Sequence, residues 1–202
     1  MNEEPVGQVL SDSPFIRRVD AFVEEDERQA LLDAARPQLQ RALVSAAHAG
    51  VESAGRTGRN CWVPHATTPV IQALAERIAV LADLPLTHAE SFQVIHYGES
   101  EEYRPHYDAW KADTERGQRC MVRGGQRLVT CLVYLNDVAS GGATCFPRLK
   151  LEIPARAGDL LLFHNCHPGT ITRHPDTLHG GMPVLKGVKW AANLWFRERP
   201  RQ

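Results

Sequence analysis

The chain has 202 residues, 43% of them hydrophobic, and a formal net charge of -1. This length suits one domain with a substantial hydrophobic core. The near-neutral charge gives no overall basic field, so composition predicts neither nucleic acid nor a membrane as a partner. The acidic N-terminal residues do not resemble a secretory signal, and no apolar stretch is long enough to cross a bilayer.

The cysteines are five in number, which is odd, and they lack the close spacing of a zinc ribbon or a redox dithiol. They indicate reduced thiols, and therefore a cytoplasmic protein, rather than a disulfide framework. These residues are Cys61, Cys120, Cys131, Cys145 and Cys166.

The periodicity of the sequence changes once, and this divides the chain into two stretches. We expect residues 1–13 to be a flexible N-terminus and residues 14–202 to form a single domain. Within it, residues 14–88 are expected to be mostly helical support, and residues 89–202 to form a β-rich core.

The first stretch contains both helix and turn signals. Residues 14–22 favour an opening strand, and residues 24–35 favour a helix that Pro37 ends or interrupts. A loop of small residues is expected over 45–67. Thr68 as cap and the proline after it then predict a second helix, with one apolar face formed by Ile71, Leu74, Ile78 and Leu81.

The second stretch is dominated by a period of two, which is typical of β-strands. Turn signals, Gly141-Gly142 and Gly180-Gly181 among them, separate the strands. Many short strands without long crossover helices favour an antiparallel jelly roll supported by the N-terminal helices. The expected strands are 91–97, 103–110, 127–136, 143–147, 159–164 and 188–197.

A candidate metal site begins with His106 and Asp108, two residues apart on an expected strand, where both side chains project from one face. His174 and Asp176 have the same spacing, but a proline and turn residues surround them, so we expect a loop there. One imidazole and one carboxylate are two of the three protein ligands in the facial triad of non-haem Fe(II) oxygenases, which consists of two histidines and a carboxylate. A second histidine is therefore needed to complete such a site.

His179 is the better third ligand, since a neighbouring strand can return it towards the first pair. Ten residues later, Lys189 shares an expected strand face with Ala191, Asn193 and Trp195. Burying a charged lysine inside an apolar barrel costs free energy unless an anion pairs with it. One carboxylate of a dicarboxylic acid is a suitable partner.

These residues belong to a set of spaced motifs that resembles the catalytic domain of prolyl 4-hydroxylases, in the 2-oxoglutarate dioxygenase superfamily. The resemblance extends over nearly the whole chain, with the motifs in the same order. They lie at residues 22–26, 56–58, 93–97, 103–108, 134–138, 141–147, 175–184 and 187–190.

The resemblance implies that His106, Asp108 and His179 bind Fe(II) and that Lys189 pairs with the outer carboxylate of 2-oxoglutarate. It also implies roles at the cofactor for Tyr97, Thr130 and Trp195, and substrate contacts by Arg56, Tyr103 and Trp195. The implied activity is hydroxylation of a peptidyl proline, using dioxygen and coupled to conversion of 2-oxoglutarate to succinate, with ascorbate as reductant. The oligomeric state and the identity of the peptide are not indicated.

Substrate contacts are expected from loops at the mouth of the barrel. These are residues 51–62, 98–102 and 111–125, the last a mobile basic loop. His164, His167 and His174 depart from the family pattern, and they are interpreted either as incidental surface residues or as a second, weak metal site.

Three alternative functions remain open from sequence. The same fold could hydroxylate a small molecule or a free amino acid. A barrel that binds a metal or ligand without catalysis would have little reason to keep an internal anion anchor. A zinc hydrolase is disfavoured because no convincing glutamate base accompanies the ligands.

Overall fold

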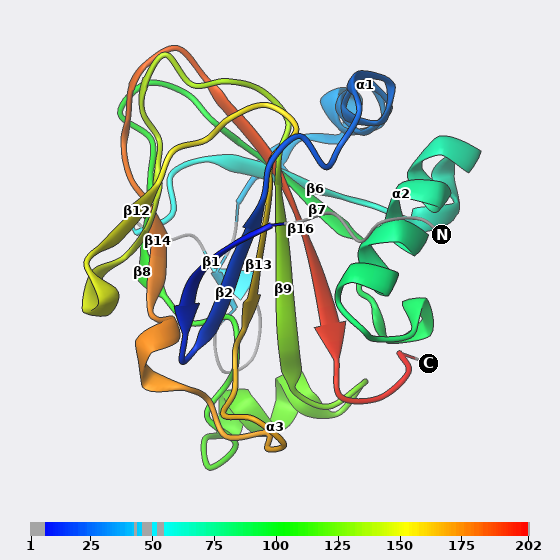
Figure 1. Cartoon of the computed structure of the whole chain (residues 1–202), viewed down its shortest axis with the longest axis vertical. Helices are drawn as coiled ribbons and strands as arrows, with labels where there is room; N and C mark the ends of the chain where they lie inside the picture. Colours follow the sequence, from blue (N-terminus) through cyan, green and yellow to red (C-terminus); the bar gives the residue numbers. More distant parts are fainter. Residues whose placement is uncertain (1–6, 43, 46–49, 52–54, 202) are drawn as a thin grey trace.

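Two facing antiparallel sheets form the centre of the computed structural model, which describes residues 7–42, 44–45, 50–51 and 55–201 (Figure 1). In the larger sheet, the described strands lie side by side in the order β1 (Gln8–Asp12), β2 (Phe15–Val19), β13 (Leu160–His164), β9 (Arg127–Tyr134), β16 (Lys189–Arg197), β7 (Phe92–Tyr97), β6 (Arg59–Val63) and β3 (Gln40–Arg41).

The smaller sheet faces the inner side of the larger one. Its described strands are, in order, β12 (Leu151–Ile153), β11 (Thr144–Phe146), β14 (His179–Gly181) and β8 (Tyr103–His106). Two short pairs accompany the sheets: β10 (Ser140–Gly141) with β15 (Val184–Lys186), and β4 (Val44–Ser45) with β5 (Gly50–Val51).

Alternating side chains divide the core into two layers, as β9 illustrates. Val129, Cys131 and Val133 pack on the outer face, against the helices, while Leu132 and Tyr134 point between the sheets. This alternation follows from the two-residue period of a strand. The two sheets with a closed apolar layer between them form the expected jelly roll.

The outer face of the larger sheet is covered by α1 (Glu25–Ala35) and α2 (Pro69–Leu81), both on one side of the molecule in Figure 1. Arg77 of α2 forms an ion pair with Glu27 of α1, which ties the two helices together. The Thr68 hydroxyl accepts the Ile71 N–H at 3.2 Å and caps α2 as predicted. The helical layer therefore supports the inner strands from behind.

The predicted elements differ from the structure chiefly in short segments. Residues 8–12, expected to be flexible, form β1 and pair with β2, and the expected loop over 45–67 contains β6. Residues 1–6, 46–49 and 52–54 lie outside the described residues. The short α3 (Glu115–Met121) lies in the expected basic loop, with the Thr114 hydroxyl accepting the Gly117 N–H.

Two further differences concern the strands that carry the candidate site. β8 ends at His106, so Asp108 lies just beyond the strand rather than on it. Gly180 and Gly181 are strand residues of β14 rather than a turn, and Gly141 is the last residue of β10, although Gly141 and Gly142 both have positive φ. None of the described helices combines the length and the apolar character needed to span a membrane.

Thr68→Ala removes the hydroxyl that caps α2, and we expect the free energy of unfolding to fall by about 1 kcal/mol. Thr68→Ser keeps the hydroxyl and serves as the control, with a change below about 0.5 kcal/mol. Urea denaturation followed by circular dichroism measures both. Equal loss in the two variants would show that the cap does not stabilise α2.

Candidate active site

The pairing of β8 with β14 brings two histidines together from distant parts of the chain. His106 is the last residue of β8, His179 is the first of β14, and the two are direct partners in the strand register. A Cβ atom at Gly180 would come within 2.8 Å of the Tyr103 carbonyl oxygen. Glycine at this position therefore allows β14 to approach β8 closely.

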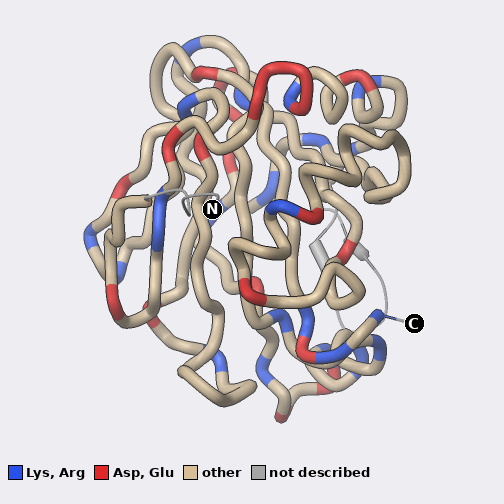
Figure 2. The backbone as a smooth tube through the Cα atoms, turned by 45° about the vertical axis from the view of Figure 1, so that its right-hand side comes forward, with Lys and Arg blue, Asp and Glu red and all other residues tan. Residues whose placement is uncertain are grey.

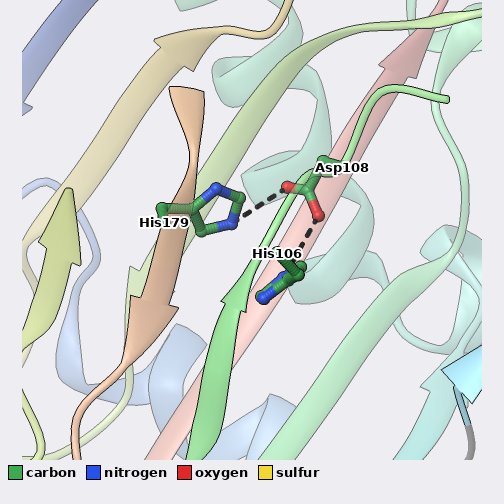
Figure 3. Close-up of side chains that lie close together, drawn as sticks. All are labelled: His106, Asp108 and His179. Carbon is green, nitrogen blue, oxygen red and sulfur yellow. Dashed lines mark ion pairs between the residues drawn. The ribbon is translucent and has the colours of Figure 1, made fainter. Parts of the chain in front are cut away.

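The three candidate metal ligands converge, as Figure 3 shows. His106 Nε2 lies 3.6 Å from Asp108 Oδ1, and His179 Nε2 lies 3.5 Å from Asp108 Oδ2. One donor atom from each residue lies within 4.8 Å of the other two. These separations leave room for one ion between the side chains.

Backbone carbonyls fix the orientation of both imidazoles. His106 Nδ1 lies 3.0 Å from the Arg104 carbonyl oxygen, and His179 Nδ1 lies 2.8 Å from that of Thr177. A carbonyl can only accept, so each Nδ1 carries the proton and donates it. In the neutral rings, each Nε2 is then left with a free lone pair directed at the shared position, the state that metal binding requires.

The charge states of the buried groups also suit a cation. Burial lowers the pKa of His179 to about 4, so its ring is neutral at pH 7. Burial alone would raise the pKa of Asp108, but His179, His106 and Arg127 hold it well below its usual value. Two neutral imidazoles and a carboxylate are the donor set that Fe(II) takes in facial-triad sites, so these residues fit that ion.

Asp108 is held in place by two neutral donors. The Thr130 hydroxyl and Trp195 Nε1 each donate to Asp108 Oδ2 at 2.8 Å, and Asn165 Nδ2 donates to the Thr130 hydroxyl at 2.8 Å. Thr130 was expected to contact the cosubstrate. The structure instead directs its one proton to the ligand carboxylate, and Thr130 does not line the cavity.

A cavity of about 230 Å³ contains the three candidate ligands and Lys189 in its walls. Lys189 is only 2% exposed, and its Nζ donates to the Gly142 carbonyl at 2.7 Å. Among the described residues it forms no ion pair, and burial lowers its pKa to about 8. Asn193 and Trp195 line the same cavity, as the spacing by twos along β16 predicts.

Tyr97, Arg56 and Tyr103 also line this cavity. Burial raises the pKa of Tyr97, whose phenol therefore stays protonated and able to donate a hydrogen bond. Arg56 Nη2 donates to Gln93 Oε1 at 3.0 Å, and its guanidinium lies 4.6 Å from the centre of the Tyr103 ring. Tyr103 in turn stacks on His106, with ring centres 3.6 Å apart.

A buried ion pair at the cavity wall was not predicted. Arg127 donates to both oxygens of Glu90, at 2.7 and 2.9 Å, and its guanidinium lies 3.6 Å from the centre of the Trp195 ring. Strict alternation along β9 would place Arg127 on the outer face. A shift in register between Phe196 and Arg197 turns it inward, and no sequence signal marks that shift.

The additional histidines do not gather into a metal site within the described residues. His174 is 5% exposed rather than on the surface, and its Nδ1 accepts the Asp176 N–H at 3.1 Å, which caps the short turn before His179. Its ring centre lies 4.3 Å from that of His167, which is exposed. His174 thus has a structural role in the approach to β14.

Comparison with known proteins identifies the family of this chain. The sequence profile of the 2OG-Fe(II) oxygenase superfamily matches residues 92–197, more than half of the chain. The chain belongs to this superfamily. The motifs of the chain resemble those of prolyl 4-hydroxylases, and similar proteins with that name support this resemblance.

Three of these similarities are informative. Human prolyl 4-hydroxylase subunit alpha-3 is 33% identical over 95% of this chain and 35% of its own length. A protein of Acanthamoeba polyphaga mimivirus, provisionally named a prolyl 4-hydroxylase, is 36% identical over 74% of this chain and 62% of its own. The structure of the viral collagen prolyl hydroxylase of Paramecium Bursaria Chlorella virus-1, a 2OG complex, has a TM-score of 0.73 at 27% identity and covers 93% of this chain and 98% of that one.

The chain spans less than two thirds of the length of the human and mimivirus relatives. The segment matched by the superfamily profile, 92–197, contains all three candidate ligands and Lys189. The family match thus extends over the strands that carry the candidate site.

Lys189→Met tests whether the buried ammonium group destabilises the fold. A charge held at a pKa of about 8 instead of 10.5 opposes folding at pH 7, so the variant should be more stable by about 2 kcal/mol. Between pH 8 and 10.5 the unfolded wild-type chain binds the additional proton, so wild-type stability should rise relative to the variant.

Urea denaturation of both proteins at several pH values measures this difference. Lys111→Met, at an exposed position, is the control and should leave the free energy of unfolding unchanged. A constant gap between wild type and Lys189→Met from pH 7 to pH 10.5 would contradict the low pKa.

Proposed function

We propose that this oxygenase is an Fe(II)- and 2-oxoglutarate-dependent dioxygenase that hydroxylates C4 of a proline within a peptide. The observation that carries the proposal is the placement of His106, Asp108, His179 and the buried Lys189 around one cavity. The relatives named as prolyl 4-hydroxylases support the proline as substrate.

Fe(II), when bound, supplies the chemistry that couples decarboxylation of 2-oxoglutarate to insertion of an oxygen atom into an unactivated C–H bond. His106, Asp108 and His179 would hold it on one face and leave the other positions open. Thr130 and Trp195 orient the ligand carboxylate through the two hydrogen bonds to Oδ2. This support keeps Asp108 in one rotamer while the open positions are used.

Lys189 would bind the outer carboxylate of 2-oxoglutarate. A buried ammonium with one carbonyl partner can still donate two hydrogen bonds, and a carboxylate satisfies both the donors and the charge. Tyr97, whose phenol keeps its proton, would donate to the same anion. Ile95, Leu132 and Trp195 in the cavity wall would exclude water from the oxidising centre.

The substrate would lie at the mouth of the cavity, beside Arg56, Tyr103 and Trp195. The stacked rings of Tyr103 and His106 give a flat surface next to the candidate iron site, suited to a proline ring. Ascorbate as the reductant and a cytoplasmic location are further parts of the proposal. The five unpaired cysteines support a reducing compartment.

A zinc hydrolase is less consistent with the cavity. Hydrolysis needs a general base beside the metal-bound water. Asp108 supplies the one carboxylate among the described residues that line the cavity, and it is the candidate ligand itself.

The proposal predicts turnover of proline peptides by the full chain. Protein loaded anaerobically with Fe(II) and 2-oxoglutarate, then exposed to oxygen, should add one oxygen atom to a peptide and form one succinate per hydroxylated proline. Mass spectrometry and amino-acid analysis for 4-hydroxyproline measure the product. His179→Ala should lose both products, and His167→Ala, at an exposed histidine, is the matched control.

Two results of this experiment would contradict the proposal in different ways. Oxygen added to free proline but to no peptide would favour the small-molecule alternative. Absence of succinate from the wild-type reaction, or equal turnover by His179→Ala, would contradict the dioxygenase assignment itself.

Lys189→Met should also raise the 2-oxoglutarate concentration needed for half-maximal succinate formation by about a hundredfold. The reason is the loss of a charge-assisted contact in a dry pocket, which contributes about 3 kcal/mol. Lys111→Met should leave this concentration unchanged. An unaltered 2-oxoglutarate requirement in Lys189→Met would remove the role assigned to the lysine.

A further inference from the structure

A basic groove, hereafter the arginine groove, opens beside the candidate active site between α3, the end of β16 and the start of β9. Its walls combine cationic and aromatic side chains with a single carboxylate among the residues described. The lining residues that matter here are Trp62, Glu90, Trp110, Arg119, Arg123, Arg127, Arg197 and Arg201.

The one carboxylate of the groove is already neutralised. Glu90 accepts hydrogen bonds from Arg127 and, at 3.0 Å, from Arg197 Nη1. Burial alone would raise the pKa of Glu90, but Arg127 and Arg197 lower it, so it is ionised. The guanidinium groups of Arg127, which is partly exposed, and of the buried Arg197 leave one positive charge in the wall after pairing with Glu90. The exposed Arg123 and Arg201 add to it.

Hydrogen bonds and ring contacts fix the walls of the groove. Arg197 Nη2 donates to the backbone carbonyls of Cys120 and Arg123, at 2.8 and 2.6 Å, and so anchors the end of α3 to β16. The Trp110 ring lies under both Arg127 and Arg197, at 4.8 and 4.6 Å. These contacts hold Arg123 at a fixed edge of the groove.

Positive charge also extends to the other side of the cavity mouth. A second groove has no carboxylate among its described lining residues. Its cations are Lys111, Arg116, Arg173 and Arg104, the last of which forms an ion pair with Glu102 at 3.2 Å. Figure 2 shows several Lys and Arg positions near the C-terminus of the chain. Glu198 lies nearby and subtracts one charge from this excess, and its carboxylate accepts the Gln126 N–H at 3.3 Å. The mouth is therefore positive although the chain carries a net charge of -1.

The arginine groove is continuous with the catalytic cavity. Trp62, Trp110, Cys120 and Arg127 line both. Trp62 is 43% exposed and lies 6.0 Å from Trp195 between ring centres, so an extended peptide leaving the cavity would cross its face. Side chains of that peptide would then enter the groove.

We propose that the arginine groove selects substrates with acidic residues close to the target proline, through Arg123 and Arg201. This inference rests on the proposed function for the position of the proline. The chemistry is charge complementarity: guanidinium groups bind carboxylates with paired hydrogen bonds, and an excess of positive charge raises the rate of encounter with an acidic peptide. Trp62 and Trp110 provide apolar contact beside those charges.

The test compares two fluorescent peptides that share one proline-containing centre and differ in the flanks, which carry Glu in one and Gln in the other. Anaerobic fluorescence anisotropy with the full chain, Fe(II) and 2-oxoglutarate measures the Kd, and mass spectrometry after oxygen exposure measures KM. Two exposed ion pairs at the groove should make Kd and KM about tenfold lower for the Glu peptide than for the Gln peptide. Added salt should reduce this difference.

In the double variant Arg123→Gln, Arg201→Gln, the Kd of the Glu peptide should rise to that of the Gln peptide. Arg36→Gln, at an exposed arginine next to α1, removes a charge elsewhere and should keep the preference. Equal binding of the two peptides by the wild type, or a preference that survives the double variant, would overturn the proposal. Tighter, Arg123-dependent binding of a short single-stranded RNA would overturn it in favour of nucleic acid.

The outcomes also separate this proposal from the hydroxylase assignment. Arginine-dependent binding of the Glu peptide without oxygen transfer would support the groove and contradict the enzyme function. Hydroxylation of both peptides with equal KM would support the enzyme function and overturn the groove.

Discussion

The antiparallel pairing of β8 with β14 is the constraint on which the candidate site depends. It places His106 opposite His179, and Gly180 makes this close approach possible because any larger residue would meet the backbone of β8. Asp108 follows β8 by two residues and completes the set. A shift of this register by one residue would turn one histidine away from the other, so the register specifies the ligand geometry directly.

The interior of the barrel carries charge that folding alone would not favour. Asp108, Lys189 and Glu90 are buried, and only Glu90 is compensated by direct partners of opposite charge, Arg127 and Arg197. The two helices behind the larger sheet offset this cost by burying a continuous apolar layer. Bound Fe(II) and 2-oxoglutarate would supply the missing charges, so ligand binding and stability are linked in this fold.

The sequence predicts the alternating strands, the capped helix at Thr68 and the grouping of Lys189, Asn193 and Trp195 well, because each depends on local periodicity. The contact between Thr130 and Asp108, and the inward turn of Arg127, depend on pairing between distant strands and on one irregular register. The position of His179 before a strand with Lys189 makes it the better third ligand, and the resemblance of several spaced motifs to a known family makes that prediction specific. No single spacing carries that information.

One ferrous ion held by three side chains is central to the proposed activity, and anomalous diffraction tests its position directly. Crystals grown without oxygen in Fe(II) and 2-oxoglutarate, measured on both sides of the iron absorption edge, should show one anomalous peak bounded by His106 Nε2, an oxygen of Asp108 and His179 Nε2. No peak at that position, or iron instead at the His167–His174 pair, would contradict the account.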